Sequence, residues 1–157
     1  MKREEVRAFL KSGADAIQMH FDSGRLTEFN SQRGKGFPFG WVESLNVSTD
    51  FGGSGAALID EWAIKIHIAK LDSTDSTQSQ YEAIVDECDQ LSRKLIWQYN
   101  IILQTATQVS TTNQDLYKLV TLSGMKRDPF IKKHADCLTG VILSFALTSP
   151  DKTDVCP

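Results

Sequence analysis

The strongest constraint on the fold is the segment EWAIKIHIAKL, residues 61–71, in which apolar and polar residues alternate. Successive side chains of an extended chain point to opposite faces, so strict alternation predicts a strand. One face holds the large apolar residues Trp62, Ile64, Ile66 and Ile68. The other face holds Glu61, Ala63, Lys65, His67 and Ala69. We therefore expect a long antiparallel strand over residues 58–71, with one buried and one solvated face.

A long helix is predicted directly after this strand, over about residues 78–104. Ser79 and Glu82 match a capping box, in which each side chain accepts a hydrogen bond from an otherwise unpaired backbone N–H. Apolar residues then recur at helical spacing: Tyr81, Ile84, Val85, Cys88, Leu91, Leu95, Tyr99 and Leu103. We expect the stripe of Ile84, Cys88, Leu91 and Leu95 to cover the apolar face of the strand.

The remaining elements complete an α+β fold in one domain, residues 1–157. The periodicity predicts an amphipathic helix at 2–21, strands at about 40–47, 116–123 and 138–148, and a flexible tail at 150–157. In the strand at 40–47, Trp41, Glu43, Leu45 and Val47 are expected on one side. The glycine-rich segment 22–40 is predicted as a loop or a weak hairpin, and the segment 48–57 as a loop. The expected architecture is an antiparallel sheet with strands of mixed length, packed against a long central helix and an N-terminal helix.

The charge balance argues against two classes of partner. The formal net charge is −3, and nucleic-acid binding needs clustered Lys and Arg to displace counterions. The N-terminal MKREEVRAFL is charged where a signal peptide is apolar, and no apolar run approaches the roughly 18 residues of a membrane span. We therefore expect a soluble, cytoplasmic product that binds neither specific nucleic acid nor membrane.

Motifs for phosphate, dinucleotide or hydrolytic chemistry are absent from the sequence. There is no Walker A loop, dinucleotide fingerprint, GxSxG elbow or HExxH, and GKGFPFG lacks the GK[ST] ending that a phosphate loop needs. The sequence thus predicts no catalytic site and no cofactor.

The cysteines and histidines do not form a recognisable metal site. Cys88, Cys137 and Cys156 are odd in number without a CxxC pair, which is typical of free thiols in a reducing compartment. Only His134 lies near a cysteine, whereas a structural zinc ion needs four ligands. We expect His20 at the edge of the first helix and His67 on a solvated or interface face.

Two groups of neighbouring carboxylates could in principle supply acid–base chemistry, which requires burial of one acid. Asp60 and Glu61 are neighbours in a strand and point to opposite faces. Asp86, Glu87 and Asp89 coincide with the polar side of the long helix, so a solvated acidic face is favoured. A small soluble enzyme, with His134 or His67 beside a carboxylate, remains an alternative function.

Two segments resemble small tail-completion and tail-terminator proteins of tailed bacteriophages, in particular prophage-type proteins of Bacteroidetes viruses. They are IKIHIAKLDSTDSTQSQYEAIVDECDQL and KHADCLTGVILSFALTSP, and the resemblance covers roughly residues 60–150. It implies a structural virion protein that forms a ring, commonly a hexamer, at the head–tail junction. Such a ring caps the tail tube, binds the head–tail connector and can let DNA pass through it. A neighbouring adaptor or stopper ring of the neck is the alternative within the virion.

This role implies assembly in the host cytoplasm, a final place in the tail or neck of the virion, and surfaces that bind another subunit. Cations beside aromatic rings suit an interface, and opposite charges favour association. The loop 31–39 carries Arg33, Lys35, Phe37 and Phe39, which we expect to be exposed. The two phenylalanines need either a partner surface, which is favoured, or a fold-back onto their own core. A second, basic patch consists of Lys126, Arg127, Lys132 and Lys133, and the acidic helix stretch Asp86, Glu87 and Asp89 is its expected partner on a neighbouring subunit.

Overall fold

The computed structural model describes residues 1–24, 38–43, 45–51, 58–73, 75–108, 120–133 and 138–150. Two helices and six strands are found there: α1 (Arg3–Ala16), β1 (His20–Ser23), β2 (Phe39–Val42), β3 (Asn46–Phe51), β4 (Leu58–Leu71), α3 (Gln78–Gln108), β5 (Thr121–Lys133) and β6 (Leu138–Pro150). The predicted α+β class is confirmed, and so are the bounds of the strand at 58–71.

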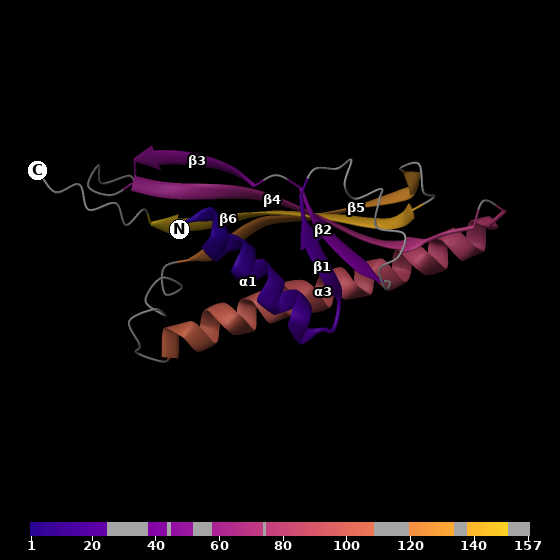
Figure 1. Cartoon of the computed structure of the whole chain (residues 1–157), viewed down its shortest axis with the longest axis horizontal. Coiled ribbons are helices and arrows are strands. Elements are labelled where there is room, and N and C mark those ends of the chain that lie inside the picture. Colours follow the sequence, from indigo (N-terminus) through magenta and orange to yellow (C-terminus); the bar gives the residue numbers. More distant parts are fainter. Residues whose placement is uncertain are drawn as a thin grey trace, which may run out of the picture.

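The strands form one mixed sheet with β4 at its centre (Figure 1). Its order is β1-β2-β4-β6-β5, and β3 also pairs with β4. One side of β4 pairs with β6 along its whole length, while the other side is shared by β3 and β2. β1 runs parallel to β2, and the other pairs are antiparallel. The expectation of a wholly antiparallel sheet was therefore wrong at β1.

Both helices lie on the same side of the sheet (Figure 1) and share one apolar core with it. The predicted inner face of β4 is buried there, together with Cys88 and Leu95 of α3 and the partly buried Ile84 and Leu91. From β6 the core receives the alternate residues Val141, Leu143, Phe145 and Leu147. The predicted contact between the strand face and the helix stripe is confirmed.

A second apolar cluster covers part of the opposite face of the sheet. It consists of Phe39, Trp41, Ala69, Phe130 and Leu138, with the partly buried Ile142 packed against them. The predicted solvated face of β4 is therefore exposed at Glu61, Ala63 and Lys65 but buried at His67 and Ala69. Aromatic side chains from the neighbouring strands β2 and β5 cover this end, which alternation within β4 alone could not reveal.

The first helix is shorter than predicted. It ends at Ala16, where the N–H of Met19 bonds to the Ala14 carbonyl at 3.0 Å and Gln18 takes a left-handed φ of 56°. This reversal lets the chain enter β1 at His20 instead of continuing the helix to residue 21.

The strand predicted at 40–47 is divided into β2 and β3 by a change of register. Val42 faces Ile66 and Asn46 faces Ala63, so three residues on this side stand opposite two on β4. The extra residue reverses the alternation, as in a β-bulge. Trp41 consequently lies in the second cluster while Leu45 lies in the main core, and the expected common face was wrong.

β5 extends beyond the strand predicted at 116–123 and includes the residues of the basic patch. It runs from Thr121 to Lys133 and changes register twice, after Ser123 and after Phe130. Gly124 lies in the first irregularity with φ 63°, a conformation that other residues rarely adopt. These irregularities let a segment with glycine and proline remain in the sheet. Of the strand predicted at 116–123, residues 116–119 lie outside the described part.

The long helix begins and ends slightly differently from the prediction. The N–H of Thr77 bonds to Oε1 of Gln80 at 2.7 Å, so the capping pair is Thr77 and Gln80 rather than Ser79 and Glu82. The helix continues to Gln108, and β6 continues to Pro150, each beyond its predicted end. Residues 151–157 of the predicted tail lie outside the description. Within the described residues, no helix is both long enough and apolar enough to cross a membrane.

Candidate interaction site

Some of the charged residues predicted at a subunit interface instead pair with each other within one chain. Arg127, on the helix side of β5, donates from Nη1 to both carboxylate oxygens of Asp89 at 2.8 and 3.0 Å. Lys126, on the opposite face, lies 3.1 Å from Asp128. The alternation of side chains along β5 thus separates two neighbouring cations, and only Arg127 reaches α3.

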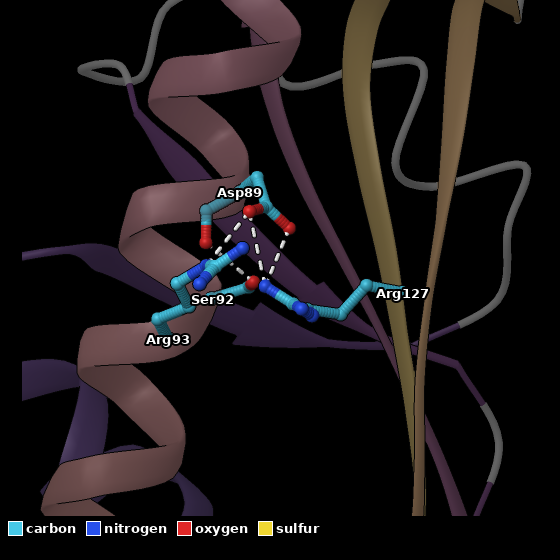
Figure 2. Close-up of polar contacts among 4 residues, drawn as sticks. All are labelled: Asp89, Ser92, Arg93 and Arg127. Carbon is cyan, nitrogen blue, oxygen red and sulfur yellow. Dashed lines mark hydrogen bonds and ion pairs between the residues drawn. The ribbon is translucent and has the colours of Figure 1, made fainter.

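Asp89 is the centre of a small charged cluster on α3 (Figure 2). Arg93, one turn further on, donates from Nε to the same carboxylate at 2.9 Å. Ser92 donates from Oγ to the Asp89 backbone carbonyl at 2.7 Å. Two guanidinium groups therefore share one carboxylate, and the cluster ties β5 to α3.

The other acidic residues of this stretch differ in their surroundings. Glu87 accepts hydrogen bonds from Lys70 of β4 at 2.6 Å, whereas Asp86 is exposed. Lys132 and Lys133 belong to β5, but only their backbone is described. The expected contact of these charges with a neighbouring subunit stays a prediction. It requires Asp89 and Glu87 to leave their partners in the same chain and to bind basic residues of the neighbour.

The aromatic loop of the sequence prediction is only partly within the described chain. Arg33, Lys35 and Phe37 lie outside it. Phe39 lies in β2 with 2 % of its surface exposed, and its ring is 6.0 Å from that of Trp41. The favoured expectation that Phe39 is exposed toward a partner was wrong. The alternative holds for this residue, because it packs into the second apolar cluster of its own subunit.

His67 is buried rather than solvated. It is 3 % exposed, its Nε2 lies 2.5 Å from Oε1 of Glu43, and its ring is 6.0 Å from that of Phe130. His20 is exposed in β1, outside the first helix where it was expected. His134 lies outside the described residues. Glu43 and His67 therefore pair a carboxylate with an imidazole at the margin of the second cluster.

The described cysteine, Cys88, is a buried free thiol. Burial, reinforced by Glu87, raises the pKa of Cys88 to about 12, so the reactive thiolate is disfavoured. Cys137 and Cys156 lie outside the described residues. Across the described ranges, no group of three or more His, Cys, Asp or Glu is placed to hold a metal ion.

The neighbouring carboxylates Asp60 and Glu61 point to opposite faces of β4, as predicted. Asp60 is 8 % exposed and accepts a hydrogen bond from Thr49 at 2.7 Å. The Met1 ammonium lies 3.6 Å away. Glu61 is exposed, so the two do not form an acid–base pair.

A surface that the sequence interpretation missed lies on α3, around the exposed Trp97. Trp97 and Ile101 are 51 % and 38 % exposed. The indole borders a shallow hollow of about 350 Å³, lined by Ile17, Arg93, Lys94, Trp97 and Gln98. A tryptophan outside the apolar stripe of an amphipathic helix was the available signal. We call Arg93, Lys94, Trp97 and Ile101 the tryptophan surface.

A scan against protein-family models and a search of curated proteins found no match to this chain.

Proposed function

We propose that this protein is a structural virion subunit, a tail-terminator or tail-completion protein that forms a ring at the head–tail junction. Its function is binding, and the observation that carries it is the tryptophan surface. Tryptophan and arginine are enriched among the residues that dominate binding energy, and here both lie on α3 beside one hollow. The sequence resemblance of residues 60–150 to tail-completion proteins supports the head–tail junction as the proposed place of action.

A second copy of the chain is the partner that we propose for the tryptophan surface. Arg93 and Lys94 give this part of α3 a positive charge, although the whole chain is negative, at −3. The first turns of the same helix carry the exposed acidic residues Glu82 and Asp86. Contact between the acidic start of one α3 and the basic middle of the next joins different surfaces of identical subunits. Such a heterologous contact forms a ring when the rotation from one subunit to the next closes.

The test uses the tail-tube subunit whose gene lies nearest to the gene that encodes this protein. Purified tube subunits are allowed to polymerise with and without this protein, and the tubes are measured by negative-stain electron microscopy. We expect short tubes that carry a ring at one end. Tubes of unchanged length with no ring would contradict the proposal, and rings that bind only the portal or connector would assign the protein to the neighbouring neck ring.

Two variants connect that result to the surface. Trp97→Ala should leave the circular dichroism spectrum unchanged and abolish capping, because its side chain is half exposed in the subunit. The matched control is Met125→Ala, which removes an exposed apolar side chain from β5, 43 % exposed, and should cap normally. Equal loss of capping in both variants would contradict the assignment of the surface.

A further inference from the structure

The two long outer borders of the sheet differ in how they are protected against pairing with another strand. An open strand edge is a template for association, and proteins commonly block it with lysine, proline or bulges. β5 carries all three, in Lys126, Pro129 and two register shifts. β3 carries none of them, and its six residues pair with β4 in unbroken register.

β3 is also accessible. Residues 46–50 are all exposed, including Val47 at 39 %. β3 pairs with β4 on one side, and no other described strand pairs with it (Figure 1). Among the described residues, the β3 edge thus combines an exposed apolar side chain with the absence of lysine, proline and register shifts, in contrast to β5.

The faces of β3 restrict how a second copy can pair with it. Val47 faces Trp62 and Thr49 faces Asp60, on the helix side of the sheet. Asn46, Ser48 and Asp50 point to the opposite side. A twofold axis perpendicular to the sheet keeps the helices of both copies on one side. Two residues paired across the axis must therefore have their side chains on the same side of the sheet, so their positions differ by an even number. The axis consequently passes through a residue and not between two residues.

With the axis at Ser48, all five exposed residues of β3 pair with the second copy. The paired side chains are then compatible in size and charge. Asn46 meets Asp50 of the second copy, an amide opposite a carboxylate. Val47 meets Thr49, a pair of β-branched residues, and Ser48 meets its own small counterpart. No like charges lie directly opposite each other, and opposite residues in a sheet interact favourably when they are β-branched or hydrogen-bonded.

We propose that β3 is a self-association edge, through which two copies of this chain pair antiparallel about Ser48 and continue the sheet from one subunit into the other. This contact is isologous and uses a different surface from the ring contact on α3. It stands whether or not the protein is a tail terminator, and it predicts a dimer of the isolated chain in solution.

A disulfide cross-link tests the register. Ser48→Cys is made with Cys137→Ser and Cys156→Ser, which leaves only the buried native Cys88. Directly opposite residues of an antiparallel pair have Cα atoms about 4.5–5.5 Å apart, within disulfide range. Mild oxidation should give a covalent dimer on a non-reducing gel. The matched control, Lys126→Cys in the same background, should not cross-link to itself. Failure of Ser48→Cys to cross-link faster than this control, or preferential cross-linking between the two variants when mixed, would overturn the proposal.

Charge changes at Asn46 provide a second measurement that needs no disulfide. The dimer contains the contact with Asp50 twice. Asn46→Lys should strengthen the dimer and Asn46→Asp should weaken it, each by about two- to thirtyfold in the dissociation constant measured by sedimentation equilibrium. Asn46 is exposed and its own neighbour on β4 is Ala63, so both variants should fold as the parent does. Equal dissociation constants for the two variants, or a reversed order, would contradict the proposed register.

Discussion

The hydroxyl of Tyr99 donates a hydrogen bond to the backbone carbonyl of Leu10 at 3.1 Å, in the buried contact between α3 and α1. The ring lies 5.0 Å from Phe9 of α1 and 5.8 Å from Phe145 of β6, measured between ring centroids. Gly13 lets the helices approach this closely, because a Cβ atom there would lie 2.3 Å from Cε1 of Tyr99. The orientation of α1 over the sheet thus depends on the absence of a side chain at residue 13.

Gly13→Ala should therefore destabilise the protein, although alanine is the better helix former. Helix propensity favours alanine by about 1 kcal/mol, whereas overpacking a core costs typically about 1–3 kcal/mol. We expect a net loss in the free energy of unfolding, measured by urea denaturation. Combining it with Tyr99→Leu removes the ring, so in that background Gly13→Ala should cost less. An equal cost in both backgrounds would show that Tyr99 is not the obstacle.

The sequence predicted the elements in which apolar residues recur at regular spacing within the element itself. The strand at 58–71 and the apolar stripe of α3 repeat over many residues, so single exceptions do not change the interpretation. The division of β2 from β3 depends on one extra residue, and the continuation of β5 past Gly124 depends on a bulge. Such irregularities arise from pairing with a distant strand, which local patterns do not contain.

The candidate surfaces were harder to predict than the core. The sequence identified Asp89 and Arg127 as charges but could not show that they meet within the chain. It identified Phe39 as unusual for a loop without indicating which surface covers it. Trp97 lies outside the apolar stripe of α3, so the periodicity that predicts the core does not indicate this exposed residue.

The inner face of β4 makes a prediction about charge burial. Ile66 is completely buried and its neighbour Lys65 is exposed on the opposite face. Ile66→Asp places an unpaired carboxylate in the core, at a cost of several kcal/mol that is comparable to the stability of a whole domain. We expect the variant to be unfolded by circular dichroism. Lys65→Asp, which adds the same group one residue away, should fold, and a folded Ile66→Asp protein would contradict the position of the core.

The buried thiol of Cys88 makes stability depend on pH in the alkaline range. Burial raises the pKa of Cys88 from 9.0 to about 12 in the folded state. Between these values the unfolded chain loses the proton and the folded chain keeps it, so stability falls as pH rises. One such proton contributes about 1.4 kcal/mol per pH unit. The free energy of unfolding of Cys88→Ala should therefore decline less steeply from pH 9 upward than that of the parent. Parallel curves for the two proteins would exclude this contribution.

The ion pair of Arg127 with Asp89 should contribute little to stability and should respond to salt. Both side chains are about one-third exposed, at 32 % and 28 %, and ion pairs near the surface contribute typically about 0.2–1 kcal/mol. A double-mutant cycle with Arg127→Ala and Asp89→Ala should give a coupling energy in this range that decreases in high salt. The pair of Arg93 with Asp89 is a natural comparison, because the Arg93 side chain is 65 % exposed. A larger coupling for Arg93 than for Arg127 would contradict the role of Arg127 in tying β5 to α3.

Truncation of Phe39 should reduce the stability of the protein far more than truncation of Trp97. Phe39 is 2 % exposed inside the second apolar cluster, so Phe39→Ala should cost about 3–5 kcal/mol in the free energy of unfolding. Trp97 is 51 % exposed, and substitutions at surface positions usually change stability by less than about 0.5 kcal/mol. Thermal denaturation of the two alanine variants measures the contrast directly. If Trp97→Ala proved as destabilising as Phe39→Ala, the indole would belong to the subunit's own core, and the tryptophan surface would lose its role as a binding site.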